Sequence, residues 1–149
     1  MNRKIISIPP NYFYLAVIII LVSRWFLPQL NLLPAVYNLI GWILLILGIF
    51  LTILTWAYFK KYQTPEDFSA SKKLIMTGPF RFSRNPMYIG MFLIVLGVTF
   101  CLRNVIGLVV IVAFWAVLEF MFVPFEEEKN ELTFGQEFLD YKKRVRRWL

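Results

Sequence analysis

The longest uninterrupted apolar stretch of the chain covers residues 35–59, which contain no charged side chain. About 20 such residues in a helix cross the hydrocarbon core of a bilayer, where every backbone polar group has to be bonded within the segment. Residues 86–102 also carry no charge, and residues 105–125 carry only Glu119. These runs exclude an ordinary soluble domain and predict membrane-spanning helices.

A fourth apolar stretch, residues 10–30, is interrupted by Arg24 near its far end, where a long side chain can extend to the membrane surface. We interpret it as an uncleaved first span, because no small-residue cleavage site follows it. The prediction is an all-α, polytopic membrane protein with four transmembrane helices. Residues 1–149 are expected to form a single membrane-embedded domain, with 59% hydrophobic residues.

Basic residues gather at the N-terminus, in residues 60–84 and in the tail after residue 125; of the sixteen Lys and Arg residues, only Arg24 and Arg103 lie elsewhere. Four spans place these three regions on one side, which the positive-inside rule predicts to be cytoplasmic together with both termini. The net charge of +7 is thus explained by topology. No basic stretch interleaved with aromatics indicates nucleic-acid binding.

The chain has no histidine and one cysteine, Cys101. The lack of histidine excludes histidine-based triads, His-ligated zinc or haem and a histidine general base. A single cysteine cannot form an intrachain disulfide and has no companion ligand for a metal. We therefore expect no metal, and chemistry that uses carboxylates, amides, phenols or a cofactor.

Two helices carry paired glycines seven residues apart, Gly41 with Gly48 and Gly90 with Gly97. Small residues at such a spacing allow two membrane helices to approach closely. The second pair is suited either to packing or to admitting a flat ligand. Only a few residues join the spans 86–102 and 105–125, so these must form an antiparallel hairpin with adjacent cytoplasmic ends.

The polar, turn-rich residues 78–90 separate two apolar runs. Asn85 followed by Pro86 predicts the start of a helix, with Asn85 as N-cap and Pro86 at the first helical position. Arg81 and Arg84 lie just before this start, where they could bind an anion together with unpaired backbone N–H groups. The alternative is a helix cap flanked by positive-inside charges.

Acidic groups lie at the end of the last span. Glu119 is a functional candidate because a buried, unpaired carboxylate is costly; the alternative is an ion pair with a basic residue near the inner interface. Pro124 removes a helical hydrogen bond and is followed by Glu126, Glu127 and Glu128 at the membrane boundary. Two helical turns separate Glu119 from Glu126, which predicts that they share a face. The acidic run could also simply favour a restarted helix.

The C-terminal tail repeats aromatic and aliphatic residues at spacings of four and three, with basic residues opposite. The members of this aromatic stripe are Phe134, Phe138, Tyr141, Val145 and Trp148. The pattern predicts an amphipathic interfacial helix that rests on the anionic cytoplasmic leaflet, and it could close over a site between the hairpin ends. Gly135 is expected to form the corner before it.

The motifs in the second half of the chain occur in a specific order. Residues 77–90, Thr-Gly-Pro-Phe-Arg-Phe-Ser-Arg-Asn-Pro-Met-Tyr-Ile-Gly, are followed by Glu126-Glu127 and then by Phe-Gly-Gln-Glu-Phe-Leu-Asp-Tyr at residues 134–141. Over residues 72–149 this resembles the superfamily of isoprenylcysteine carboxyl methyltransferases and phospholipid methyltransferases. The family pattern is a Leu-Val pair, a Gly, Arg-His-Pro-x-Tyr-x-Gly and a Glu pair, which surround S-adenosylmethionine.

The resemblance implies a set of cofactor contacts in this chain. They are Lys72, Lys73, Leu74, Ile75, Phe80, Asn85, Pro86, Met87, Tyr88 and Glu126. Asn85 and Lys72 replace family histidines, and Phe80 replaces a tyrosine; Asn85 can still position a ligand but cannot transfer a proton. Phe122 stands where the prenylcysteine enzymes carry an arginine for the substrate carboxylate, so prenylcysteine is not the expected substrate.

The activity that the resemblance implies is methyl transfer to a lipid-like or amphiphilic acceptor, a carboxylate or a headgroup, at the cytoplasmic face. We assign catalytic roles to Arg84 and Glu127 and substrate contacts to Arg81 and Glu119. An ammonium acceptor would need a base, for which Glu119 or Glu127 is the nearby type, whereas a carboxylate would need none. The alternatives are an NADPH-dependent membrane reductase with a similar motif and a non-catalytic membrane protein.

Overall fold

The computed structural model describes residues 9–62 and 73–149, which form helices and contain no strand. The main helices are α1 (Pro9–Phe26), α2 (Tyr37–Lys61), α3 (Pro86–Cys101), α4 (Val105–Val117), α5 (Val123–Phe134) and α6 (Gln136–Arg144). Two 3-10 turns, η1 (Pro28–Leu30) and η2 (Gly78–Arg81), and a π-helical turn, η3 (Leu118–Phe122), complete the secondary structure. The all-α prediction is confirmed for these residues.

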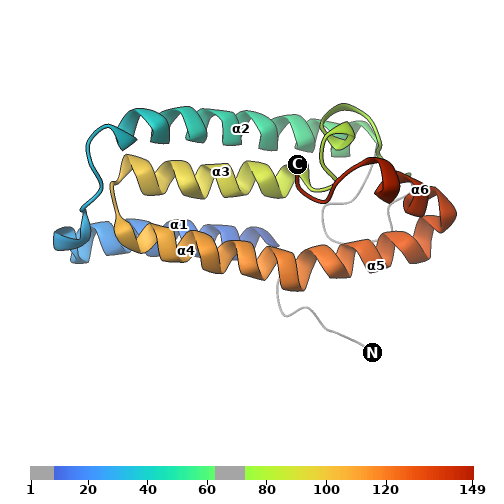
Figure 1. Cartoon of the computed structure of the whole chain (residues 1–149). Helices are drawn as coiled ribbons and strands as arrows, with labels where there is room; N and C mark the ends of the chain where they lie inside the picture. The colour runs from blue at the N-terminus through green and yellow to red at the C-terminus, as the bar shows by residue number, and fades with distance from the viewer. Residues whose placement is uncertain (1–8, 63–72) are drawn as a thin grey trace.

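The first four helices lie side by side in an elongated bundle (Figure 1). Helix α3 packs against α2, against α4 and against α1, and α1 also packs against α4. The predicted hairpin of α3 and α4 is confirmed. The chain continues from α4 through η3 into α5 as one long helix that extends past the bundle, and α6 folds back toward the start of α3.

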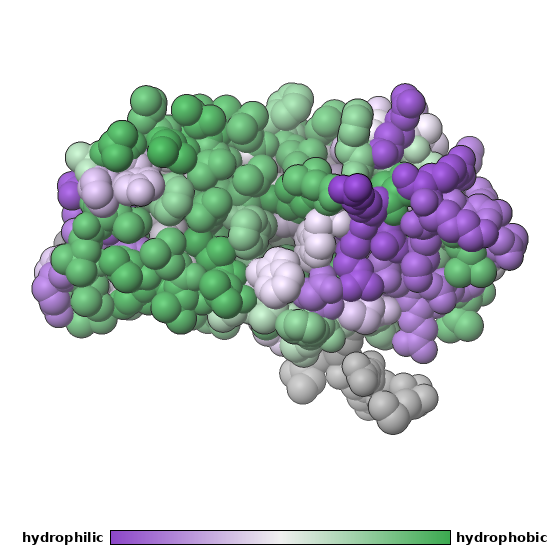
Figure 2. Space-filling view, in the orientation of Figure 1, coloured by the Kyte–Doolittle hydropathy of each residue, from purple (hydrophilic) through white to green (hydrophobic). Residues whose placement is uncertain are grey.

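Apolar surface covers most of the bundle, and hydrophilic residues gather at the end that carries α5 and α6 (Figure 2). Among the described residues, α2 and the continuous helix of residues 105–134 are long and apolar enough to cross a membrane, and α3 is apolar but shorter. Large side chains of α2 such as Trp42, Ile46 and Phe50 are exposed. So wide an apolar surface is typical of a membrane protein; four spans and their orientation stay predictions.

Two glycine pairs bring the backbones of α2 and α3 together. A Cβ atom added to Gly41 would lie 2.9 Å from the carbonyl oxygen of Gly97, and one added to Gly48 would lie 2.7 Å from that of Gly90. Real side chains do not approach so closely, so these positions accept only glycine without a shift of the helices. The predicted close packing is confirmed, and this face leaves no room for a flat ligand.

The end of the bundle opposite α5 and α6 is closed by the α3–α4 turn. Asn104 is fully buried and caps α4, because its side-chain oxygen accepts the N–H of Ile106 at 2.8 Å. Its amide nitrogen donates to Ser23 Oγ of α1 at 3.0 Å. Arg103 donates from Nε to the carbonyl of Leu33, and its own carbonyl accepts the N–H of Leu33 at 3.2 Å. These bonds tie the hairpin to the first two helices.

The corner between α5 and α6 lies at Gly135, as predicted. Its φ of 53° falls in the left-handed region, which favours glycine, and its N–H donates to the carbonyl of Glu131 at 2.9 Å. The turn sends α6 back over the end of the bundle, where the motif residues lie.

Candidate active site

The predicted start of α3 is correct, but the predicted side-chain cap is wrong. Pro86 is the first helical residue and Asn85 occupies the N-cap position without a side-chain capping bond. Instead, Asn85 Nδ2 donates to the carbonyl of Arg147 at 2.9 Å. The backbone N–H of Asn85 donates to Ser83 Oγ at 3.0 Å. The Asn85 side chain therefore bonds the C-terminal segment through its amide nitrogen and does not cap α3 through its amide oxygen.

Tyr88 of α3 and Glu126 of α5 are in direct contact. The Tyr88 hydroxyl donates to Glu126 Oε1 at 2.5 Å, and Tyr88 is buried. The sequence predicts that the ends of the two hairpin arms are adjacent, and this contact agrees with that prediction. A hydrogen bond to a carboxylate is stronger than one between neutral groups, so this pair links α3 firmly to α5.

The π-helical turn η3 changes the register of the acidic residues. Pro124 lies in the first turn of α5 and has no N–H to donate, and η3 directly precedes it. A π turn contains one residue more than an α turn, so Glu127 instead of Glu126 comes to the side of Glu119. The predicted shared face of Glu119 and Glu126 is therefore wrong: Glu126 contacts Tyr88, whereas Glu119 and Glu127 both contact Arg147.

Arg147 connects the two carboxylates. Its Nη2 lies 2.8 Å from Glu127 Oε2, its Nε lies 3.2 Å from Glu127 Oε1, and its Nη1 contacts Glu119 Oε1. Arg84 Nη1 is 2.8 Å from Glu127 Oε1, and Trp148 Nε1 donates to Glu119 Oε2 at 2.8 Å. The hydrogen bonds to Glu127 and Glu119 raise the pKa of Arg147. The ion-pair interpretation of Glu119 thus agrees with its surroundings, and its partner comes from the tail.

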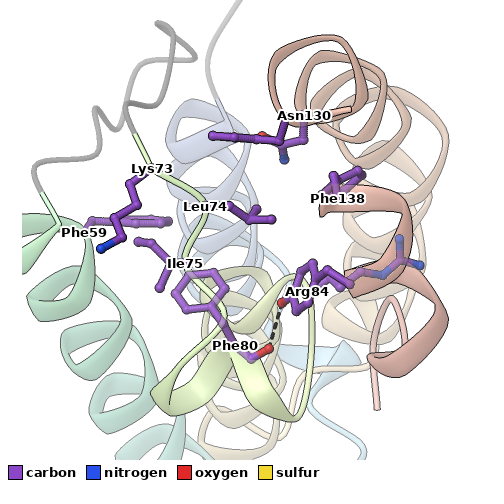
Figure 3. A pocket seen from close by; sticks show the side chains of 10 residues that line it. Phe59, Lys73, Leu74, Ile75, Phe80, Arg84, Asn130 and Phe138 are labelled. Carbon is purple, nitrogen blue, oxygen red and sulfur yellow. Dashed lines mark hydrogen bonds between the residues drawn. The ribbon is translucent and has the colours of Figure 1, made fainter. Parts of the chain in front are cut away.

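A cavity of about 80 Å³ lies between α2, the residues before η2, and α5–α6 (Figure 3). Its lining consists of Phe59, Lys73, Leu74, Ile75, Phe80, Arg84, Asn130, Phe134, Phe138 and Tyr141. Five of the predicted site residues, at positions 73–75, 80 and 84, therefore converge here. Such a volume holds several water molecules. Lys72, another predicted contact, lies outside the described residues.

Other predicted site residues do not line the cavity. Pro86 and Tyr88 are buried at the start of α3, and Met87 packs against the bundle core. Arg81 is exposed on η2. Two groups of predicted site residues thus stand out, the cavity lining and the buried Tyr88–Glu126 pair. Arg84 lines the cavity and also pairs with Glu127, the neighbour of Glu126.

Sequence reasoning assigned the aromatic stripe of the tail to the membrane surface, but Phe138 and Tyr141 are buried against the protein, at 2% and 3% exposure. The Tyr141 hydroxyl donates to the carbonyl of Phe80 at 2.7 Å, and burial raises the pKa of Tyr141 to about 12. Trp148 packs against the bundle core. Phe138 and Tyr141 line the cavity. Closure of the tail over a functional site and contact of α6 with the bilayer both stay predictions.

The chemistry of the two groups differs. Aromatic and aliphatic side chains form the cavity walls and suit a flat apolar ring, with the Arg84 guanidinium at the edge for an anion. The Tyr88–Glu126 pair offers a phenol and a carboxylate, which suit hydroxyl groups or a cation. Among residues 9–62 and 73–149, no three His, Cys, Asp or Glu side chains lie close enough together to hold a metal ion.

A comparison with models of protein families finds one match: residues 36–137 correspond to the phospholipid methyltransferase family. The matched region begins just before α2, includes both residue groups of the site and ends in α6, so Arg147 and Trp148 lie beyond it. No curated protein and no solved structure matches the chain significantly.

Proposed function

The chain belongs to the phospholipid methyltransferase family, and from this premise we propose that it transfers a methyl group from S-adenosylmethionine to a lipid-like or amphiphilic acceptor at the cytoplasmic membrane face. The observation that carries this proposal is the convergence of residues 73–75, Phe80, Arg84, Tyr88 and Glu126 at one end of the bundle. These positions come from three separate segments; the resemblance implies all of them as cofactor contacts except Arg84, to which we assign a catalytic role.

The residues present fit S-adenosylmethionine. Leu74, Ile75 and Phe80 supply apolar walls for an adenine ring, and Glu126 can accept the two ribose hydroxyls or attract a positive charge. The Tyr88 hydroxyl can bond the methionyl end once it leaves Glu126. Arg84 Nε, which has no hydrogen-bond partner in the described part of the chain, can donate to a carboxylate, while Nη1 stays paired with Glu127. When bound, the cofactor supplies a methyl group made electrophilic by a sulfonium.

The contribution of the protein is then to position, to exclude water and to balance charge. Transfer to an anionic acceptor neutralises charge, so a dry site lined by Phe134 and Phe138 lowers the barrier when acceptor and methyl lie in line. Glu119 and Glu127 are both bound by Arg147. Either carboxylate would have to leave this partner before accepting a proton from an ammonium group.

The membrane orientation forms part of the proposal: four spans, with both termini and the residues between α2 and η2 at the cytoplasmic face. A cysteine at position 70, in a chain with Cys101 replaced by alanine, tests it in inside-out and right-side-out vesicles. Labelling by an impermeant maleimide should occur only in inside-out vesicles. Labelling from the opposite side would contradict the orientation.

The activity is tested by incubating the purified protein, in nanodiscs made from a total lipid extract, with S-adenosylmethionine that carries a deuterated methyl group. Mass spectrometry of the lipids should then reveal labelled products that are absent with the Glu126→Gln variant. Titration calorimetry with S-adenosylmethionine and NADPH separates the alternatives. Binding of NADPH alone would indicate a reductase-like protein, and binding of neither would indicate a non-catalytic membrane protein.

A further inference from the structure

The last residues of the chain, 145–149, form a short segment that we call the C-terminal strap. It is bonded through its backbone to the start of α3. The N–H of Arg84 donates to the carbonyl of Arg146 at 3.0 Å, and the carbonyl of Arg147 accepts from Asn85 Nδ2 at 2.9 Å. These bonds place the guanidinium of Arg147 next to Glu127, beyond the region that matches the family.

The Arg147 guanidinium uses three nitrogen atoms on carboxylates. Nε and Nη2 contact the two oxygens of Glu127 at 3.2 Å and 2.8 Å, and Nη1 contacts Glu119. The planar guanidinium suits such two-point binding of a carboxylate, and lysine cannot reproduce it. Both oxygens of the buried Glu127 therefore already have a donor before Arg84 is considered.

The Arg84 guanidinium is only partly satisfied by protein acceptors. Its Nη1 lies 2.8 Å from Glu127 Oε1, yet neither Nη1 nor Nε makes a hydrogen bond in the part of the chain that the structure describes. Both atoms are buried, and the side chain borders the cavity (Figure 3). Nη1 has the Glu127 carboxylate as its charge partner, whereas Nε has no acceptor among the residues described. A buried charged donor without an acceptor is costly, so an anion that reached Nε would be bound favourably.

We propose that Arg147 is a positioning residue: by binding both oxygens of Glu127, it limits Arg84 to one contact with that carboxylate and leaves Arg84 Nε for an anionic group beside the cavity. This inference rests on the proposed function. The anion would be a carboxylate from the cofactor or a phosphate from a phospholipid acceptor. Without Arg147, Arg84 would bind the Glu127 carboxylate with two donors, Nε included, and would have none left for the anion. Lys142 Nζ, which lies 3.8 Å from Glu127 Oε2, is another cation near this carboxylate.

The test uses titration calorimetry of the full chain in detergent micelles with two probes. S-adenosylmethionine carries the carboxylate, and glycerol 3-phosphate carries the phosphate without acyl chains. Arg147→Ala should weaken binding of one probe about tenfold, and Arg147→Lys should weaken it less. The probe that is affected identifies the anion. The matched control, Arg146→Ala, removes an exposed guanidinium from the same strap and should bind like the parent.

A double variant separates positioning from a general loss of structure. If Arg147 acts through Arg84, then adding Arg147→Ala to Arg84→Gln has no further effect on binding, because both changes remove the same interaction. A further, additive loss overturns the inference, and so does an Arg147→Ala variant that binds both probes like the parent. A parent chain that binds neither probe overturns the proposed function and this inference together, a result distinct from an effect confined to the Arg147 variants.

Discussion

Helix α3 contacts α2 and α5 in different ways. Toward α2, Gly90 and Gly97 bring backbone against backbone, and no acidic or basic side chain is among the atoms nearest to these glycines. Toward α5, Tyr88 bonds a carboxylate, and the residues just before α3 contact the strap. The contact with α2 is close packing, whereas the contact with α5 contains polar groups that can exchange a protein partner for a ligand. Changes at the first should therefore lower stability, and changes at the second should lower ligand binding.

The largest effect is expected from Gly97→Leu, in the contact with α2. Its Cβ would lie 2.7 Å from the backbone nitrogen of Leu45 and 2.8 Å from the carbonyl oxygen of Gly41, so the helices have to separate. Overpacking of this kind costs about 1–3 kcal/mol or more. Thermal unfolding in micelles, followed by circular dichroism, should show the loss. Val109→Leu, an enlargement at an exposed position of α4, is the control; an equal loss there would contradict the comparison.

On the site side, Glu126→Gln should weaken binding of S-adenosylmethionine by about 1–3 kcal/mol, the range for a hydrogen bond to a charged group, with little change in the unfolding midpoint. Tyr88→Phe should also weaken binding, since it removes the hydroxyl that contacts Glu126. Calorimetric titration measures both. Parent-like affinity in the two variants would mean that the cofactor binds elsewhere and that the acidic run only starts α5.

Tyr141 lines the cavity, and its raised pKa predicts that its contribution to stability depends on pH. Its pKa in the folded chain, about 12, lies above the ordinary tyrosine value near 10 because of burial. Its stabilising contribution is therefore complete below pH 10 and is lost as the pH rises toward 12. Tyr141→Phe removes the bond to Phe80, worth about 1 kcal/mol. The gap in unfolding midpoint between parent and variant should narrow between pH 8 and pH 11; a constant gap would contradict the buried phenol.

The smallest effect is expected from Lys143→Ala. Lys143 pairs with Asp140 at 2.9 Å, but the two side chains are 71% and 51% exposed. Exposed pairs contribute little, because water and salt screen them. Neither the unfolding midpoint nor the affinity for S-adenosylmethionine should change measurably. A loss of affinity would show that the basic face of α6, in place of the buried groups, controls the site.

The helices followed from the sequence because a membrane requires long uncharged runs, and the start of α3 followed from Asn85-Pro86. The order of motifs also located the cavity residues at 73–75. The inward packing of Tyr141 did not follow, since an aromatic stripe has the same spacing whether it faces lipid or protein. Arg147 lies among several basic residues, and nothing in its sequence position distinguishes it from Arg146.

The π-helical turn η3 has a consequence for how relatives of different length should be aligned. It accommodates one residue more than a regular turn, so a chain with one residue deleted between Glu119 and Pro124 could form a plain α-helix there and still present its Glu127 equivalent in the same direction. A deletion in this segment is thus expected to be tolerated where a substitution of Glu127 is not. In an alignment with such chains, the equivalent of Glu127 should be identified by the side of the helix on which it lies. An alignment without a gap in this segment would pair Glu127 with the wrong residue.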